Sequence, residues 1–309
     1  MILDQTSHNS TRQVLEALAQ DPNGVLAVIS GVEGPSYRPV GAMMAVLGDG
    51  RWVGSLSSGC IEADIALHAR DVARAGEPRS IRYGAGSPFV DIALPCGGGL
   101  DILLVPRPDP RVLTTILERH QQRRPLTLQI DTGSGDVALG DESSSDSAFS
   151  VRLEPELRFV IFGKGPEACA FSALVQSVGY PNLLVSPDDE SRAIAVAAGC
   201  DTQSIDLPDF PADVHVDART AIVLFFHDHD WEPPILHHAL GTNAFYIGAQ
   251  GSWNAREVRL AALRELGCKD AALDRLHGPV GLVPSARDAR TLAVSVLAEV
   301  LGTALALDR

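Results

Sequence analysis

Two cysteines lie where the chain is rich in glycine, and a thiol in such a place could do chemistry. Cys60 follows a Ser-Ser-Gly turn and comes directly before a stretch with helical spacing. A helix N-terminus favours the thiolate, which is a ligand for soft metals and a reagent in sulfur chemistry. Cys96 lies between Pro95 and three glycines, where the backbone can closely approach a bulky ligand. The alternative for each cysteine is a small buried apolar side chain, the role we expect for Cys169, Cys200 and Cys268.

A second candidate site is a glycine turn in the other half of the chain. Residues 163–168 (Gly-Lys-Gly-Pro-Glu-Ala) fit the pattern G-x-G-x-x-G/A, directly after an apolar strand and at the start of a helix. Gly163 allows the tight turn, Gly165 lets the backbone approach a phosphate, and Ala168 lets the helix pack close to the strand. The helix N-terminus adds free N–H groups and a partial positive charge. The alternative is a turn that packs without binding a dinucleotide.

The acid that a dinucleotide site needs for the ribose is displaced in this sequence. Ser186 occupies the expected position at the end of the next strand, and Asp188 and Asp189 follow it. Either Asp188 reaches back to the ribose, or the turn does not hold NAD in the usual way.

A histidine–aspartate cluster follows an apolar strand at 221–226. Residues 227–230 read His-Asp-His-Asp, and ligands of open α/β sheets bind beyond the carboxyl ends of the strands. His227, Asp228 and His229 could therefore hydrogen-bond a substrate or cofactor, hold a divalent metal, or form a structural turn.

A further glycine turn joins a strand to a helix at 248–252. Gly248, Gly251 and Ser252 precede a predicted helix over 253–266 that carries Arg256 and Arg259. Such a turn suits an anion, although a tight loop with no ligand has the same pattern.

The elements that must position these residues differ between the two halves. In the first half, apolar spacing predicts an α+β arrangement, with helices over 10–20, 61–75 and 110–121 and strands over 24–30, 42–47, 51–54, 79–83 and 100–105. In the second half, strands at 158–162, 182–185, 221–226 and 244–248 alternate with helices. Nearly continuous apolar strands between helices indicate a parallel sheet covered on both faces. We therefore predict an α/β protein whose second domain is a Rossmann-like, doubly wound parallel sheet.

Length and polarity divide the chain into two predicted domains. With 309 residues, it exceeds the usual size of one domain. The Ser- and Asp-rich stretch at 141–149 is the most polar one, so we predict a polar loop over 134–150 and a boundary near 153–157. The expected domains are 1–153 and 154–309.

Composition excludes some partners. There are 25 basic and 39 acidic residues, a net charge of −14, which argues against nucleic acid and anionic membranes. No secretory signal is visible, and no stretch approaches the roughly 18–20 uninterrupted apolar residues that span a bilayer. We expect a cytoplasmic protein with no membrane partner, whose five cysteines are free thiols.

Together these motifs resemble those of the xanthine dehydrogenase accessory (XdhC/CoxI) family. Residues 34–43 (Gly-Pro-Ser-Tyr-Arg-Pro-Val-Gly-Ala-Met) are similar to its segment GS-x-P-R-x-x-G-A-x-M, and residues 54–62 to its segment G-x-(I/V)-S-G-G-C-(V/L)-E. Cys96-Gly97-Gly98 matches a second Cys-Gly-Gly motif, and residues 278–282 are similar to (A/S)-P-I-G-L. The resemblance spans nearly the whole chain in order. Departures occur at Ser58, at 253–254 and at 283–286.

The resemblance implies a chaperone rather than a catalyst. Such proteins bind molybdenum cofactor (molybdopterin), support its sulfuration with a cysteine desulfurase, deliver it to an apo molybdenum hydroxylase such as xanthine dehydrogenase, and commonly form dimers. It implies that Cys60 and Cys96 hold the molybdenum or guard its terminal sulfur, with Glu62 orienting the site or accepting protons. Gly59, Gly97 and Gly98 would lie beside the cofactor, and the glycine turns would hold the phosphate of the pterin.

Two other functions are compatible with the residues. One is a nucleotide-dependent oxidoreductase that uses NAD(P), or a metal-assisted enzyme that uses His227 and His229; Ser186 at the place of the ribose-binding acid weakens the dehydrogenase version. The other is a scaffold that bridges partner proteins without using its sites.

Overall fold

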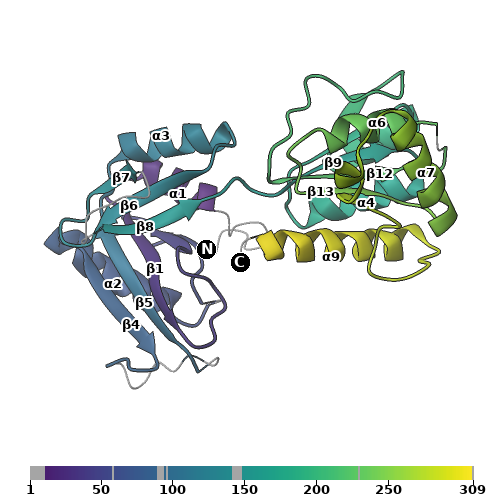
Figure 1. The fold of residues 1–309 in the computed structure, drawn as a ribbon. Helices are drawn as coiled ribbons and strands as arrows, with labels where there is room; N and C mark the ends of the chain where they lie inside the picture. Colours follow the sequence, from purple (N-terminus) through teal and green to yellow (C-terminus); the bar gives the residue numbers. More distant parts are fainter. Residues whose placement is uncertain are drawn as a thin grey trace. The chain divides into compact units, whose positions relative to one another are not determined.

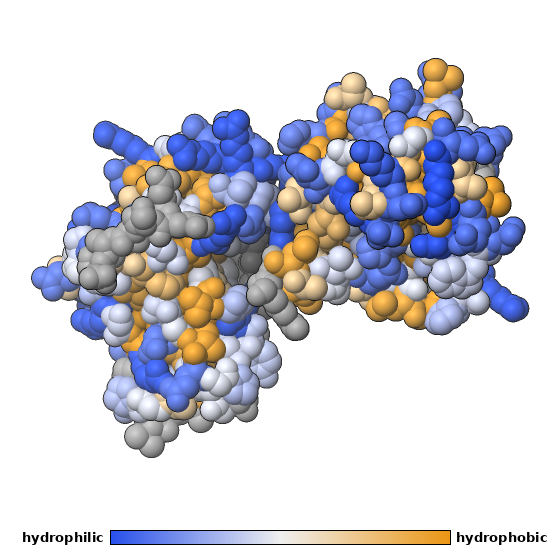
Figure 2. Space-filling model, in the orientation of Figure 1, coloured by the Kyte–Doolittle hydropathy of each residue, from blue (hydrophilic) through white to orange (hydrophobic). Residues whose placement is uncertain are grey.

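The computed structural model describes residues 11–57, 59–88, 94, 97–140, 148–228 and 230–307. The chain divides between Pro155 and Glu156 into two compact units, unit 1 and unit 2 (Figure 1). On the face shown in Figure 2, hydrophilic residues cover most of each unit and hydrophobic ones form smaller areas between them.

Unit 1 is built on an antiparallel sheet with the strand order β3-β2-β1-β5-β4. Its strands are β1 (Val25–Glu33), β2 (Met43–Val46), β3 (Trp52–Gly54), β4 (Arg79–Gly84) and β5 (Gly99–Pro106). Side chains alternate across β1: Ala27 and Ile29 enter one hydrophobic cluster, and Leu26 and Val28 enter another. Both faces of this sheet are therefore buried, as expected when apolar residues fill both sides of a strand.

Each face of the sheet has its own cover. Helix α2 (Glu62–Ala75) packs on one face through Ile65, Ala69 and Val72. The other face is covered by α1 (Thr11–Gln20), α3 (Pro110–Gln121) and a small antiparallel sheet of order β7-β6-β8. The strands of that sheet are β6 (Leu126–Asp131), β7 (Val137–Gly140) and β8 (Ala148–Leu153).

This small sheet corrects one prediction. A polar loop was predicted over 134–150, but β7 occupies 137–140 and β8 begins at 148, whereas 141–147 lie outside the described residues. The two strands form because both pair with β6 and because Val137 and Val151 are buried against the core of unit 1. Pairing with β6 and burial against the core outweighed the polar local composition.

Unit 2 holds a parallel sheet of six strands in the order β11-β10-β9-β12-β13-β14. The strands are β9 (Arg158–Gly163), β10 (Asn182–Ser186), β11 (Asp201–Ser204), β12 (Thr220–Phe225), β13 (Tyr246–Ala249) and β14 (Leu276–His277). Counted from β9, this is the order 3-2-1-4-5-6 of a doubly wound dinucleotide-binding fold. The predicted fold class is confirmed.

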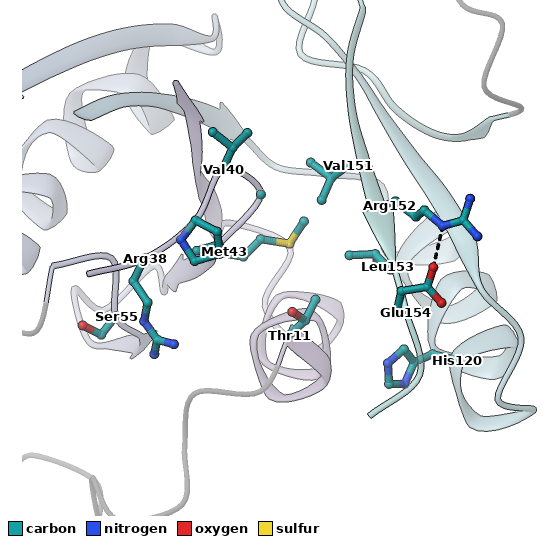
Figure 3. Close-up of a pocket in the computed structure, with 13 residues that line it drawn as sticks. Thr11, Arg38, Val40, Met43, Ser55, His120, Val151, Arg152, Leu153 and Glu154 are labelled. Carbon is teal, nitrogen blue, oxygen red and sulfur yellow. Dashed lines mark hydrogen bonds and ion pairs between the residues drawn. The ribbon is translucent and has the colours of Figure 1, made fainter. Parts of the chain in front are cut away.

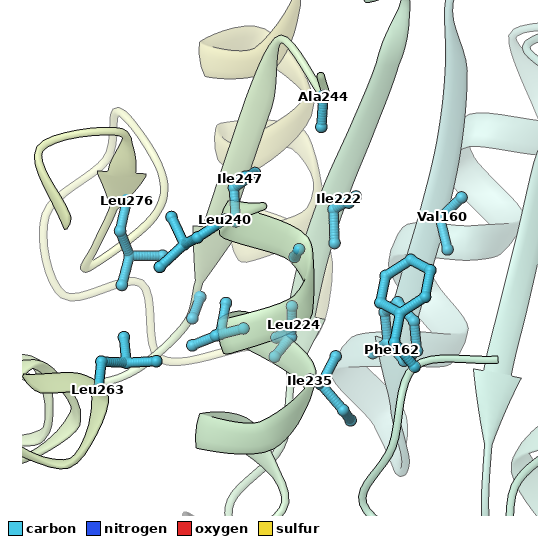
Figure 4. Packing of buried hydrophobic residues seen from close by; sticks show 14 of the residues in the cluster. Val160, Phe162, Ile222, Leu224, Ile235, Leu240, Ala244, Ile247, Leu263 and Leu276 are labelled. Carbon is cyan, nitrogen blue, oxygen red and sulfur yellow. The ribbon is translucent and has the colours of Figure 1, made fainter. Parts of the chain in front are cut away.

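Helices cover both faces of the parallel sheet. One face packs against α4 (Pro166–Ser177), α5 (Asp189–Ala197) and α9 (Ala289–Leu307), and the other against α6 (Glu232–Leu240) and α7 (Trp253–Glu265), while the short α8 (Asp270–Leu273) follows α7. Figure 4 shows Ile222 and Leu224 of β12 facing Ile235 and Leu240 of α6. Between β9 and β12 the strand order reverses, because successive strands are added on opposite sides of β9. Ligands of such sheets bind at this switch point, beyond the C-terminal ends of the two strands.

Among the described helices, α9 has the length and composition of a membrane span. Its Ala293, Val296, Val300 and Ala304 are buried in the core of unit 2. Packing against the sheet is thus one sufficient reason for its apolar composition.

Candidate functional site

Three connections that carry the motifs lie at one end of the five-stranded sheet. Strands β1, β3 and β4 end there and β2 and β5 begin there, since Glu33 and Gly84 both pair with Gly99, and Gly54 pairs with Met44. The antiparallel directions therefore bring together the strand ends that border the connections over 34–42, 55–61 and 85–98.

The Cys60 connection is organised around one carboxylate, that of Glu62, which is 3% exposed. Glu62 Oε1 accepts hydrogen bonds from the Ser55 hydroxyl at 2.6 Å and from the amides of Leu56 and Ser57 at 2.9 and 2.8 Å. Glu62 Oε2 accepts from the Ser57 hydroxyl at 2.9 Å and from the Gly59 amide at 3.0 Å. Glu62 thus fixes the shape of the turn that precedes α2.

The same hydrogen bonds set the charge state of Glu62. Burial raises the pKa of this carboxyl, but the hydrogen bonds from Ser55 and Ser57 outweigh it and bring the pKa below its ordinary value. An ionised carboxylate whose oxygens already accept several N–H and O–H groups is suited to orienting the turn, one of the two roles predicted for it. The other role, accepting protons, has less support from this geometry.

Cys60 lies at the exposed tip of this turn. Cys60 is an exposed residue. Its backbone amide and that of Ile61 both donate to Ser57 Oγ at 3.1 Å. By contrast, Cys169 and Cys200 are buried, as predicted for structural cysteines, and burial raises the pKa of both thiols. The alternative of a buried apolar Cys60 is wrong.

The organising serines were not predicted as site residues. Ser55 and Ser57 became recognisable only from their contacts with Glu62. No local sequence pattern marked them, because Glu62 is the first residue of α2 and its bonds to Ser55, Ser57 and Gly59 reach back into the preceding turn.

The two glycines next to the cysteines leave open space. Gly59 has φ 102° and Gly97 has φ 73°, and a Cβ on either would meet no atom of the described residues within 4 Å. Gly98 differs, since a Cβ there would lie 2.1 Å from the Pro35 carbonyl oxygen, so contact between two backbone segments explains this glycine. Cys96 lies outside the described residues.

The glycine turn of unit 2 has the predicted strand–turn–helix form. Gly163 pairs with Phe225 across the switch point, and a Cβ there would come within 2.6 Å of the Phe225 carbonyl oxygen. Ala168 is fully buried against the sheet. These two residues therefore do what the pattern predicts for the packing of the turn.

The groups that would hold a dinucleotide are engaged elsewhere. The Gly165 amide donates to Ser191 Oγ at 2.9 Å, and Asp188 accepts from the hydroxyl and the amide of Ser191 at 2.5 and 2.8 Å as the cap of α5. These Ser191 hydrogen bonds hold the pKa of Asp188 below its usual range. Pro166 has no N–H group, so this helix N-terminus presents fewer donors to a pyrophosphate.

The histidine cluster meets an acid of that same turn. His227 Nε2 lies 3.3 Å from Glu167 Oε2, across the switch point, whereas Asp228 is exposed and accepts from the Asp230 amide. His229 lies outside the described residues. In the described part of the chain, no three histidine, cysteine or acidic side chains gather as a metal site would require.

In the predicted glycine turn at 248–252, Gly248 serves packing and Ser252 serves helix capping. A Cβ on Gly248 would come within 2.6 Å of Val280 Cγ1, and Ser252 Oγ accepts from the Ala255 amide at 3.1 Å as the cap of α7. Gly251 has φ 138°.

Arg259 of α7, the helix that follows this turn, was not predicted to form an ion pair inside the protein. Arg259 is 3% exposed and forms a buried ion pair with Glu232 at 2.9 Å, and its Nη2 donates to the Gln250 carbonyl at 2.7 Å. Arg259 therefore anchors the 250–252 turn from inside.

Comparison with known proteins follows the same division of the chain. A family model described as "XdhC and CoxI family" matches residues 17–84, and one described as "XdhC Rossmann domain" matches residues 159–300. The molybdenum cofactor insertion chaperone PaoD of Escherichia coli (strain K12) is 36% identical over 298 residues, which cover 95% of this chain and 87% of that protein. A probable xanthine dehydrogenase component of Bacillus subtilis (strain 168) is 24% identical, with 94% and 96% covered. A crystal structure of a xanthine dehydrogenase from Bacillus halodurans superposes with a TM-score of 0.79 at 25% identity and covers 96% of each chain.

Proposed function

Because the chain belongs to the XdhC and CoxI family, we propose that it binds molybdenum cofactor as cargo and delivers it to an apo molybdenum hydroxylase such as xanthine dehydrogenase. The support is the similarity over almost the whole chain to a molybdenum cofactor insertion chaperone. Support for the sulfuration of the cargo with a cysteine desulfurase, and for a homodimer, comes from the family resemblance alone. The protein acts in this proposal as a carrier rather than as a catalyst.

The observation that carries the proposal is the exposed Cys60 on a turn held by Glu62. A soft thiolate suits molybdenum or its terminal sulfur, and a turn whose shape is already set loses little freedom when it binds. Gly59, directly before Cys60, leaves open space in which the cargo can approach the backbone. Cys96, next to the open Gly97, is the proposed second thiol.

The test is cofactor retention by the full chain. Wild type, Cys60→Ala and Cys96→Ala are incubated anaerobically with molybdenum cofactor and desalted, and molybdenum and pterin are then measured per chain. We expect near-stoichiometric cofactor on wild type and a loss of at least about tenfold in Cys60→Ala, since one metal–thiolate contact of about 1.4 kcal/mol or more is removed.

Cys268→Ala is the matched control, because it removes a half-buried thiol of unit 2 and should retain the cofactor. Wild type that retains no cofactor would contradict the proposal. Retention by both Cys60→Ala and Cys96→Ala would contradict the assignment of the thiols and favour a scaffold.

The alternative of an NAD(P)-dependent oxidoreductase has less support. The glycine pattern of a dinucleotide site is present in unit 2, but the Gly165 amide and the carboxylate of Asp188 are both hydrogen-bonded to Ser191. Glu167 adds a negative charge in the first turn of α4, where a pyrophosphate would lie. Negative charge at that position opposes anion binding at a helix N-terminus. The glycine turn therefore supports packing of unit 2 better than dinucleotide binding.

A further inference from the structure

A pocket of about 270 Å³ opens on unit 1 beside the Cys60 turn (Figure 3). It is formed by the 38–43 segment that leads into β2, by Ser55, by the start of α1 at Thr11, by His120 of α3, and by β8 and the residues after it. These parts of unit 1 are far apart in the sequence, and the pocket shares only Ser55 and the 38–42 part of the first connection with the site described above.

One side of the pocket carries a positive charge. Arg38 is half-buried, and no ion pair or side-chain hydrogen bond joins its guanidinium to another described residue. The second arginine of the lining, Arg152, forms an ion pair with Glu154, drawn as a dashed line in Figure 3. The lining thus keeps one net positive charge in a chain whose net charge is −14.

Another part of the wall is apolar. Met43, Val151 and Leu153 are at most 7% exposed and contribute carbon surface to the pocket, and Val40 lies near Val151 in Figure 3. A pocket with a partly apolar wall and a guanidinium that is paired with no described residue fits a ligand that joins a ring system to an anionic group.

The pocket is tied to the Cys60 turn through Ser55. The Ser55 hydroxyl donates to Glu62 Oε1 at 2.6 Å, and the Gly59 amide donates to Glu62 Oε2 at 3.0 Å. The pocket wall and the residue before Cys60 are therefore bound to the same carboxylate. This shared carboxylate links the pocket to the Cys60 turn.

We propose that this pocket binds the phosphorylated pterin part of the cargo, with Arg38 pairing with its phosphate monoester. The inference rests on the proposed function and adds a subsite for the end of the cargo that Cys60 does not hold. Arg38 then distinguishes the phosphorylated pterin from the same pterin without its phosphate, because only the former has an anionic group that pairs with the guanidinium.

The test compares two probes on the full chain under anaerobic conditions. One probe is metal-free molybdopterin with its phosphate, and the other is the same compound after treatment with phosphatase. We expect wild type to bind the phosphorylated probe about tenfold to a hundredfold more tightly, because a hydrogen-bonded ionic pair in a partly buried site is lost with the phosphate. Arg38→Gln should lower the affinity for the phosphorylated probe by a similar factor and leave the affinity for the other probe unchanged.

Arg70→Gln is the matched control, since Arg70 is an exposed arginine of α2 near the turn at Gly50, at the other end of the same sheet. It should retain the preference for phosphate. The alkylation rate of Cys60 and the melting temperature should be equal in wild type and Arg38→Gln, which shows that the turn and the fold are intact.

Two results would overturn the inference while leaving the proposed function in place: equal binding of both probes by wild type, or an equal loss of both probes in Arg38→Gln. Wild type that binds neither these probes nor the molybdenum-loaded cofactor would contradict the proposed function itself.

Discussion

At the scale of single residues, Glu62 decides how Cys60 is presented. Its carboxylate accepts from two hydroxyls and from backbone amides of the turn, so the turn depends on one ionised side chain. Removing a charged acceptor leaves several buried donors without a partner, which costs more free energy than the net gain from the bonds themselves.

We expect Glu62→Gln to lower the free energy of unfolding by about 2–4 kcal/mol at pH 7. The folded pKa of Glu62 lies below its ordinary value of 4.5. Its contribution is therefore fully present above the unfolded pKa and is lost as the pH falls through the lower folded pKa. The difference between wild type and variant in urea unfolding should stay constant down to about pH 5 and shrink below about pH 4.5.

Glu77→Gln serves as the control, because Glu77 is an exposed acid just after the same helix. It should change stability by less than about 0.5 kcal/mol. A difference for Glu62→Gln that grows as the pH falls would contradict the role assigned to the ionised carboxylate.

At the scale of elements, the turn between β9 and α4 has the glycine pattern of a dinucleotide site but uses it for packing. Gly163 and Ala168 fulfil the steric demands of the pattern, since one touches the β12 backbone and the other the core. The donors and the acid that the ligand would use are instead joined to α5 through Ser191.

We expect neither NAD nor NADP, oxidised or reduced, to raise the melting temperature of the protein. A ligand at 100 times its dissociation constant stabilises the folded state by about 2.7 kcal/mol, which differential scanning fluorimetry detects easily. Ser191→Ala frees the Gly165 amide and is the informative variant. A clear shift with wild type would restore the oxidoreductase alternative.

At the scale of the whole molecule, each unit has separate hydrophobic clusters. Those of unit 1 lie on the two faces of the antiparallel sheet, and those of unit 2 on the two faces of the parallel sheet. A compact unit with its own core can fold alone.

We therefore expect a fragment of residues 156–309 to unfold cooperatively on heating, followed by circular dichroism at 222 nm. A fragment of residues 164–309 is the control, because it lacks β9, which pairs with both β10 and β12. That fragment should show no cooperative transition. The same behaviour in the 156–309 fragment would contradict the division into two folding units.

Most elements could be predicted from the sequence because their signals are local. The helix over 110–121 and the strands β9, β10, β12 and β13 follow from apolar patterns and turn residues within a few positions of each element. The short strands β11 and β14 of the same sheet were not predicted. The small sheet of unit 1 could not be predicted as well, since β7 and β8 owe their strand form to pairing with β6.

By itself, the sequence determined the kinds of groups present and their local setting: Cys60 at the start of a helix beside a glycine, and a glycine turn between a strand and a helix. Only the tertiary structure decided which partners those groups have. It assigned the carboxylate of Asp188 to Ser191, joined Ser55 to Glu62, and placed Arg38 beside Ser55 in one pocket. The physical reason is range: a turn or helix depends on neighbouring residues, whereas a hydrogen bond or a pocket wall depends on the direction and register of strands that meet only after the chain has folded.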